Sequence, residues 1–351
     1  MYIFLNKGMY PKMILRLFAM ALIAINLISL KDERMYFSDD VQLLPQHANQ
    51  LKQLCPIGEI KKGRWINATY NAPPYTPMRG EVQQKTCRDF KAGKIFHTYE
   101  WEPDAVHSKG CVFKIFNKTS YCEIMKNKTV AIVGDSVSMD HYLSLTHLLG
   151  VPRALPRAIP KDRLITSSVC SNTSTLVGKR DFYLNSVNDI VREYSPDVLV
   201  LNRGAHYVDD GTLLSHMKQT LFPQLMDWQK SCRLKSRDCY LVWRTTVPGH
   251  PNCAQFTKPA TSVETMEKIV RTGGNGYHWE KFSVQNELVL KAFKLSSITY
   301  EVMDAYHTNI LRPDLHIGND CLHTCLPNDN TYASFFHHML LNHYSTTVNI
   351  K

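Results

Sequence analysis

The stretch Thr129-Val130-Ala131-Ile132-Val133-Gly134-Asp135-Ser136 decides the fold class of this 351-residue chain. Its first five residues are β-branched or small and apolar, which is typical of a strand buried on both faces of a parallel sheet. Residues 137–149 then place apolar side chains at helical spacing and stop at Gly150. The sequence therefore predicts a strand that turns into a helix at Gly134-Asp135-Ser136.

The rest of the C-terminal region repeats this alternation of strand and helix. Further buried strands are expected at 197–202, 240–246 and 298–303, and helices at roughly 186–194, 211–230, 278–294 and 331–344. Strands that alternate with helices form a parallel sheet covered on both faces. We therefore expect residues 126–351 to form a three-layer α/β core with a central parallel sheet.

The N-terminal part of the chain has a different character. Residues 17–30 carry no charge and follow three basic residues, so we expect residues 1–30 to be a cytoplasmic tail and an uncleaved signal-anchor helix. A cleaved signal peptide, which would leave a secreted protein, is the alternative. Residues 31–54 are polar and predict a stem. Residues 55–125 are rich in cysteine, proline and aromatic residues, which predicts a loop-rich lobe stapled by disulfides.

Ten cysteines and four Asn-x-Ser/Thr sequons indicate an oxidising, glycosylating compartment. We expect the cysteines to be paired, to tie the 55–125 lobe to the α/β core and to hold the segment 320–323. The predicted glycosylation sites are Asn67, Asn117, Asn127 and Asn172.

The formal net charge of +10 is unevenly distributed, because residues 61–135 contain 13 basic and 7 acidic residues. No run exceeds two consecutive basic residues, so we expect no nucleic-acid-binding arm. The basic excess is either an ordinary solvated surface or a field that steers an acidic glycan.

The turn Gly134-Asp135-Ser136 carries the first candidate for catalysis. In an open parallel sheet, ligands bind beyond the carboxyl ends of the strands, which is where this turn is expected. A serine at the start of a helix has its backbone N–H at the positive helix terminus. That position suits a nucleophile that also stabilises an oxyanion. The alternative is that Ser136 is only the N-cap of the helix.

Asp320 and His323 form the second candidate. A serine nucleophile needs an imidazole to accept its proton and a carboxylate to fix the tautomer of that imidazole. An aspartate three residues before a histidine supplies the carboxylate within one turn. We therefore predict Ser136 as nucleophile, His323 as base and Asp320 as the residue that orients the base.

Asn202 and Gly204 follow the predicted strand 197–202 and form the third candidate. We expect the Asn202 side chain and the Gly204 N–H to join the Ser136 N–H around an oxyanion, with Asp135 in the same substrate-binding group. An ordinary Asn-x-Gly turn after a strand is the alternative.

Together these motifs resemble the SGNH/GDSL hydrolase superfamily, and most closely its PC-esterase branch, the trichome-birefringence-like polysaccharide O-acetyltransferases. The family's closing pattern D-C-x-H-W-C-L-P is matched by Asp320-Cys321-Leu322-His323-Thr324-Cys325-Leu326-Pro327. Its N-x-G-x-H-W block is matched by residues 202–207, and an Arg-Thr-x-x-Pro-x-His segment lies at 244–250. Thr324 and Tyr207 stand where the family has tryptophan.

This resemblance implies an SGNH-like fold in a single-pass type II protein of the Golgi membrane with a luminal catalytic domain. It implies an O-acetyltransferase that forms an acetyl-serine at Ser136 and passes the acetyl group to a hydroxyl of a polysaccharide or glycan. No tightly bound cofactor is expected, and the acetyl donor is acetyl-CoA or an acetylated intermediate.

Two alternatives keep the same fold. A luminal or secreted carbohydrate acetylesterase would use the same triad with water as the acceptor. A non-catalytic glycan-binding protein would use Trp65, Tyr75 and Trp101 as stacking platforms, although such aromatic residues more often form a core.

A metal site is a further alternative, with Cys321, His323 and Cys325 as ligands. The second possible ligand set is Asp135, Asp140 and His141. The Cys-x-His-x-Cys spacing is not a usual zinc pattern, and thiols in the secretory lumen tend to pair with each other. We therefore expect no metal.

Overall fold

The computed structural model describes residues 53–71, 87, 91, 93–151, 164–206, 209–273, 277–317, 319–326 and 330–348. The predicted cytoplasmic tail and signal-anchor, and nearly all of the predicted stem, lie outside the described residues. None of the helices within the described ranges is long and apolar enough to cross a membrane. Residues Lys52–Lys351 form one compact unit.

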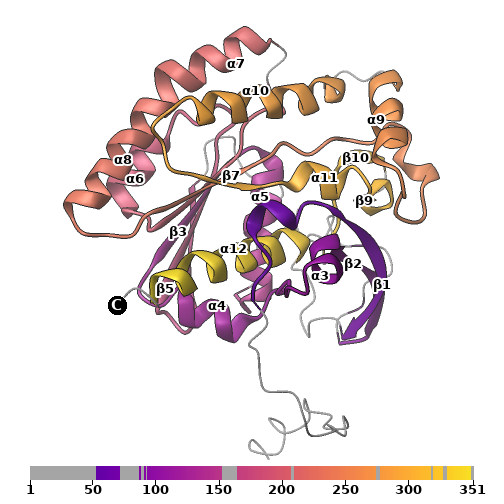
Figure 1. The fold of residues 1–351 in the computed structure, drawn as a ribbon, viewed down its shortest axis with the longest axis horizontal. Helices are drawn as coiled ribbons and strands as arrows, with labels where there is room; N and C mark the ends of the chain where they lie inside the picture. Colours follow the sequence, from indigo (N-terminus) through magenta and orange to yellow (C-terminus); the bar gives the residue numbers. More distant parts are fainter. Residues whose placement is uncertain are drawn as a thin grey trace, which may run out of the picture. The chain divides into compact units, whose positions relative to one another are not determined.

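A six-stranded sheet lies at the centre of this unit (Figure 1). In spatial order its strands are β4 (Leu164–Val169), β5 (Ser174–Arg180), β3 (Thr129–Gly134), β6 (Val198–Leu201), β7 (Tyr240–Arg244) and β8 (Glu301–Met303). Strands β5, β3, β6, β7 and β8 all run in the same direction, whereas the edge strand β4 runs antiparallel to β5. The α/β fold class is confirmed, but the sheet is mixed because of a strand pair that the sequence did not predict.

Strands β4 and β5 were missed because their residues do not form a continuous apolar run. Ser and Thr interrupt both strands, and Gly178 also interrupts β5. The turn between them contains Cys170, Ser171 and Asn172, all with positive φ, and no Gly or Pro marks it.

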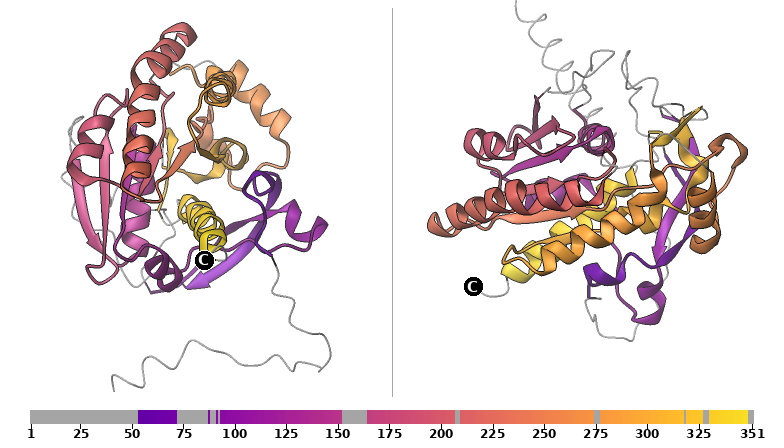
Figure 2. Two further views of the ribbon diagram at one scale, coloured as in Figure 1. Left: turned by 60° about the vertical axis from the view of Figure 1, so that its left-hand side comes forward. Right: turned by 90° about the horizontal axis from the view of Figure 1, so that it is seen from above.

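Helices cover both faces of the sheet, which gives the expected three layers (Figure 2). Alternate residues of β3 point to opposite sides: Ile132 packs with α5 (Ser136–Leu148) and α12 (Asn330–Val348), and Val133 packs with helices on the other face. Those other helices are α6 (Val187–Tyr194), α7 (Asp210–His216), α8 (Phe222–Leu234) and α10 (Phe282–Lys294).

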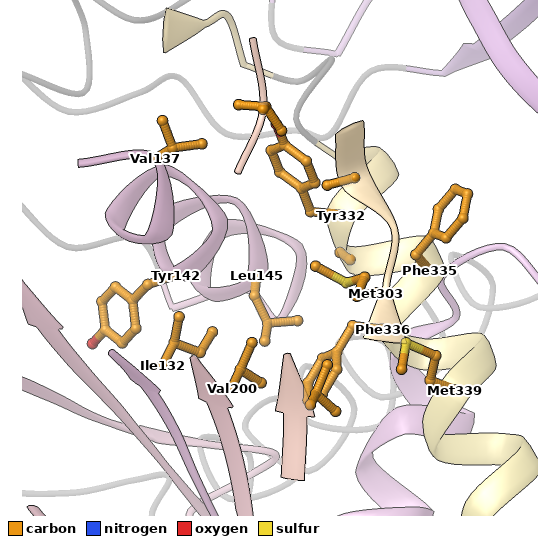
Figure 3. Packing of buried hydrophobic residues seen from close by; sticks show 14 of the residues in the cluster. Ile132, Val137, Tyr142, Leu145, Val200, Met303, Tyr332, Phe335, Phe336 and Met339 are labelled. Atoms are coloured by element: carbon orange, nitrogen blue, oxygen red, sulfur yellow. The ribbon is translucent and has the colours of Figure 1, made fainter. Parts of the chain in front are cut away.

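The core beneath α5 and α12 is aliphatic and aromatic. Figure 3 shows Leu145 of α5 and Phe336 of α12 close to Ile132 and Val200 of the sheet. All four side chains are buried. Burial of this kind fixes α5, and with it the turn that carries Ser136, on the end of β3.

In the α/β core, the observed helices differ from the predicted ones by one division and by two helices that were not predicted, of which α11 (Ala305–Asn309) is the shorter. The predicted helix 211–230 is divided, because a π-helical turn at Met217–Leu221 joins α7 to α8. Helix α9 (Val263–Thr272) was not predicted.

The N-terminal lobe contains regular structure that the sequence did not reveal. Strands β1 (Gly63–Asn71) and β2 (Ile95–Pro103) form an antiparallel pair over nine residue pairs. Short helices α3 (Asp104–Ser108) and α4 (Lys118–Ile124) follow. Trp101 is buried and donates its indole N–H to the Ile60 carbonyl.

Trp65 and Trp101 pack edge to face, with ring centroids 5.3 Å apart. The Trp65 indole N–H donates to the Thr308 carbonyl, and the Arg312 guanidinium lies 4.4 Å from the Trp65 ring. Both tryptophans therefore pack the lobe against the rest of the unit rather than stand free as stacking platforms. Tyr75 lies outside the described residues.

All ten cysteines are paired, as predicted. The pairs are Cys55–Cys111, Cys87–Cys325, Cys122–Cys170, Cys232–Cys239 and Cys253–Cys321. Two of these bonds join the 55–125 segment to the α/β core, and two hold the residues on either side of His323.

Candidate active site

The turn between β3 and α5 presents Ser136. Asp135 is the N-cap of α5, because its Oδ1 accepts hydrogen bonds from the Val137 N–H at 3.0 Å and the Ser138 N–H at 3.2 Å. Ser136 is the first helical residue, so the alternative that it merely caps the helix is wrong. Its hydroxyl is therefore available for another contact.

Gly134 is needed because the chain is crowded at this turn. A Cβ atom added there would collide with the Ser138 side chain and lie 2.8 Å from the Asn202 carbonyl oxygen. Such a contact would push apart the ends of β3 and β6. The glycine therefore allows the turn that carries Ser136 and the end of β6 at Asn202 to approach each other.

The three predicted triad residues come together. His323 Nε2 lies 2.7 Å from Ser136 Oγ, and His323 Nδ1 lies 2.7 Å from Asp320 Oδ2. Asp320 and His323 belong to the short strand β10 (Asp320–Thr324), which lies outside the six-stranded sheet. A serine, an imidazole and a carboxylate in this order form the arrangement that activates a serine hydroxyl.

The Asp320 carboxylate holds the histidine by its backbone as well as by its ring. Asp320 Oδ1 accepts the backbone N–H groups of Leu322 and His323, each at 3.1 Å. Burial would raise the pKa of Asp320, but hydrogen bonds from the His323 ring and from these backbone groups outweigh it and hold the pKa below its usual range. The ionised carboxylate stabilises the Nδ1–H tautomer, which leaves Nε2 to accept the Ser136 proton.

Disulfides fix both sides of His323. Cys321 is bonded to Cys253, and Cys325 is bonded to Cys87. The sulfur atoms of the alternative Cys321–His323–Cys325 metal site are therefore used in two different disulfides, and that alternative is wrong. In the second set, Asp135 caps α5, and the described residues contain no group of three suitable side chains placed to hold a metal ion.

The Asn202 side chain is bonded in a way that the sequence did not predict. Its Nδ2 donates to the Arg244 carbonyl at 2.9 Å and to Thr246 Oγ1 at 3.2 Å, and these contacts are buried. The amide therefore ties the end of β6 to the last residue of β7 and to the loop after it. A role for Asn202 in stabilising an oxyanion stays a prediction, and it requires the amide to release one of these contacts.

Two backbone N–H groups are further candidates for oxyanion donors. Within the described part of the chain, the N–H groups of Ser136 and Gly204 donate to no carbonyl. The Ser136 N–H lies in the first turn of α5, where helix N–H groups have no partner within the helix. A Cβ atom at Gly204 would collide with the Thr246 hydroxyl, so this position requires glycine. The substrate-binding roles of Gly204 and Asp135 stay predictions.

Arg244 stabilises the turn that carries Ser136 through buried side-chain contacts. Its side chain is buried, and its Nη2 donates to Ser138 Oγ at 2.9 Å and lies 3.7 Å from Asp135 Oδ1. Arg244 was identified from the sequence only as the first residue of the Arg-Thr-x-x-Pro-x-His segment at 244–250. The signal that marks it is an arginine at the end of an otherwise apolar strand, because a buried cation needs a partner.

Comparisons with known proteins found relatives with a common activity. No family model matches the chain. Xyloglucan O-acetyltransferase 4 of Populus trichocarpa is 23% identical over 310 residues, which are 69% of this chain and 71% of the relative. Xyloglucan O-acetyltransferase 3 of the same organism is 22% identical over 336 residues, which are 77% of this chain and 80% of the relative. The resemblance to plant polysaccharide O-acetyltransferases is confirmed by these relatives.

Among solved structures, the chain is similar to the periplasmic domain of a lipopolysaccharide acetyltransferase from Salmonella ser. Paratyphi A. The TM-score is 0.32 at 15% sequence identity, and the match covers 68% of this chain and 90% of the other.

Proposed function

We propose that this homologue of plant xyloglucan O-acetyltransferases transfers an acetyl group to a hydroxyl of a polysaccharide or glycan through an acetyl-Ser136 intermediate. The observation that carries the proposal is the contact of His323 with both Ser136 Oγ and Asp320 Oδ2, each at 2.7 Å. The relatives support a polysaccharide as the acceptor.

In the first half-reaction, Ser136 Oγ attacks the carbonyl carbon of the acetyl donor while His323 Nε2 takes the hydroxyl proton. Asp320 stabilises the resulting imidazolium through Nδ1–H. The developing oxyanion accepts from the N–H groups of Ser136 and Gly204, and the positive end of α5 favours its charge. The intermediate then collapses to acetyl-Ser136, and the leaving group of the donor departs with the proton from His323.

In the second half-reaction, an acceptor hydroxyl gives its proton to His323 and its oxygen attacks acetyl-Ser136. The new ester forms as Ser136 Oγ leaves and recovers the proton from His323. These steps need no tightly bound cofactor. The donor proposed is acetyl-CoA or an acetylated intermediate, because the acetyl group must be bonded to a leaving group that Ser136 can displace.

A carbohydrate acetylesterase is the second candidate. The Asp320 side chain is 49% exposed, so water reaches the Asp320 edge of the triad and can compete with the glycan as acceptor. In that case His323 would activate water, and acetyl-Ser136 would give free acetate.

We propose that the catalytic unit works in the lumen of the secretory pathway, as a type II protein of the Golgi membrane or as a secreted protein. Five disulfides support an oxidising compartment. The sequon residues Asn67, Asn117, Asn127 and Asn172 are all exposed, as glycosylation requires.

The decisive experiment follows a labelled acetyl group. The full chain, expressed in a secretory host, is incubated with labelled acetyl donor and a panel of plant glycans, and Ser136→Ala and Ser231→Ala are compared. We expect the wild type and Ser231→Ala, a serine on the remote helix α8, to acetylate a glycan and to carry acetyl on the Ser136 peptide. Ser136→Ala should do neither.

The distribution of the label decides between the two candidates. Label in glycan supports the transferase, whereas label only in free acetate for every glycan supports the esterase. Equal activity of Ser136→Ala and the wild type would refute both.

A further inference from the structure

Two histidines from separate segments form a continuous chain of contacts that ends at His323. His250 is fully buried in the loop after β7, and His316 begins the short strand β9 (His316–Ile317). His250 Nε2 lies 3.0 Å from the Ile310 carbonyl oxygen, and His250 Nδ1 lies 2.6 Å from His316 Nε2. His316 Nδ1 lies 3.1 Å from the His323 carbonyl oxygen. The two rings thus link the Ile310 carbonyl to the backbone of His323, whose own ring contacts Ser136.

Strand β10, which carries His323, has little sheet structure to hold it. It pairs with β9, a strand of two residues, and the register between Asp320 and Thr324 is irregular. The pair β9–β10 is separate from the six-stranded sheet that carries Ser136. The position of His323 relative to Ser136 therefore depends on local anchors rather than on a continuous ladder of hydrogen bonds.

The anchors come largely from the His250 loop. The Cys253–Cys321 disulfide joins that loop to β10, and the His250 N–H donates to the Cys321 carbonyl at 2.8 Å. These contacts act on the residue two positions before His323. The contact from His316 acts on His323 itself.

We propose that His316, oriented by His250, is a positioning residue that donates its Nδ1–H to the His323 carbonyl and so holds the His323 ring against Ser136. This inference rests on the proposed role of the Ser136–His323–Asp320 triad and adds two residues to it. Neither His250 nor His316 touches a reacting atom, so their effect on the reaction is exerted through His323.

The number of available protons restricts how this pair can bond. Three contacts join two carbonyl oxygens and two rings, and each contact needs one proton because a carbonyl oxygen only accepts. Two neutral imidazoles carry two N–H groups. One contact therefore has no proton while both rings are neutral, and a lone pair then faces a lone pair. The contact that lacks a proton is one of the two ring-to-carbonyl contacts. The contact between His250 Nδ1 and His316 Nε2 is the shortest of the three, at 2.6 Å, so two facing lone pairs would repel most strongly there.

The surrounding charges decide which end keeps its proton. The carboxylates of Asp320 and Asp314 raise the pKa of His316 and the His323 ring lowers it, whereas the charge that acts on His250 is that of the His316 ring, which lowers the pKa of His250. Negative charge near His316 favours a proton on its outer nitrogen, Nδ1, which is the nitrogen that faces the His323 carbonyl. Burial lowers the pKa of His250 to about 3 and that of His316 to about 4. At neutral pH both rings are therefore neutral, and each carries one N–H group.

Two substitutions of His316 separate its two contacts. In His316→Asn the side-chain amide nitrogen is bonded to Cγ, as Nδ1 is, so it can still donate to the His323 carbonyl but does not reach His250. In His316→Gln the amide lies one atom further out, as Nε2 does, so it can reach His250 but not the His323 carbonyl. The matched control is His338→Gln, because His338 is a buried histidine on α12 that bonds Lys114 N–H and the Cys55 carbonyl.

The readout is the rate at which a fluorophosphonate probe labels Ser136 of the full chain, with loss of fluoride, measured by intact mass. This rate reports the activation of Ser136 without any glycan. We expect His316→Gln to be slower than the wild type by on the order of tenfold to a hundredfold, because a misplaced base of this kind costs that much. His316→Asn should regain most of the rate, and His338→Gln should label as the wild type does.

The outcomes separate this inference from the proposed function. If the wild type is not labelled at Ser136 at all, the proposed triad fails. If the wild type is labelled and His316→Gln reacts equally fast, the positioning role fails while the triad stands. Equal slowing in His316→Asn and His316→Gln would likewise overturn the inference, because it would show that packing and not the Nδ1–H donor matters.

A second measurement does not depend on any variant folding. Nitrogen NMR of histidine-labelled wild-type protein at neutral pH distinguishes protonated from unprotonated ring nitrogens. We expect the Nδ1–H tautomer for His250 and His316 and the Nε2–H tautomer for His338, whose Nδ1 accepts from Lys114. A His316 ring with its proton on Nε2 would refute the proposal.

Discussion

His323 Nε2 lies 2.7 Å from Ser136 Oγ, although 187 residues separate the two along the chain. Ser136 is fixed by the end of β3 in the main sheet, whereas His323 belongs to a two-stranded sheet of its own. The distance between Ser136 and His323, the proposed nucleophile and base, therefore depends on the bonds that join these two parts.

Asp320→Asn should lower turnover by roughly 10²- to 10⁴-fold, less than Ser136→Ala or His323→Ala, because triad members act as a unit and the carboxylate contributes least alone. The amide retains an oxygen for the Leu322 and His323 N–H groups but no longer stabilises the imidazolium. The measurement is kcat with a saturating acetyl donor.

The control for this prediction is a second Asp-x-x-His pair in the same chain. Asp304 Oδ2 lies 2.9 Å from His307 Nδ1, with the same three-residue separation. Asp304→Asn should keep wild-type turnover. A loss as large as that of Asp320→Asn would mean that the two pairs share a role.

Removal of the Cys253–Cys321 disulfide should reduce the labelling rate of Ser136 as well as stability. The double variant Cys253→Ser/Cys321→Ser frees the residue two positions before His323, and a disulfide typically contributes ~2–4 kcal/mol to the free energy of unfolding. The matched control is Cys232→Ser/Cys239→Ser, which opens a bond between residues only seven apart. We expect the control to lose some stability in thermal unfolding but to label at the wild-type rate. Equal rates for both variants would show that β10 does not need this anchor.

Gly204→Ala should lower the free energy of unfolding by roughly 1–3 kcal/mol, because its Cβ would be forced against the Thr246 hydroxyl that Asn202 also contacts. Gly211→Ala is the matched control, because its Cβ would meet only Asp209 Oδ1 at an ordinary 3.4 Å. We expect Gly211→Ala, at the start of α7, to be neutral or slightly stabilising. Chemical denaturation of the two variants compares the sites, and equal stabilities would contradict the crowding at Gly204.

His307 should titrate above its ordinary pKa of 6.5, because the hydrogen bond and the charge of Asp304 raise its pKa against the effect of burial. The folded state then binds the proton more tightly than the unfolded chain. The resulting stabilisation is complete below pH 6.5 and is lost as pH rises through the folded pKa. Proton NMR titration of the His307 ring measures the shift, and Asp304→Asn should bring the pKa down. An unchanged pKa in that variant would contradict the assignment to Asp304.

The features of this protein that depend on residues close together in the chain could be predicted from the amino-acid sequence. The apolar run Thr129–Val133 predicted β3, and Gly134-Asp135-Ser136 predicted the turn into α5, because strand and helix periodicities are local. The Asp320–His323 contact is also local, since three residues separate the two side chains. The even cysteine number indicated that disulfides form.

Only the tertiary structure decided what depends on residues far apart in the chain. The spacing of cysteines does not determine which of them pair. The bonds of Cys321 to Cys253 and of Cys325 to Cys87 are therefore known only from the three-dimensional structure. The same holds for Asn202, whose amide bonds the Arg244 carbonyl and the Thr246 hydroxyl, contacts that no local pattern indicated. The contacts that join His250 to His316 and His316 to His323 link residues 66 and 7 positions apart, and they are formed by packing. No local pattern specifies such contacts, because the free energy that forms them comes from burial of the whole unit.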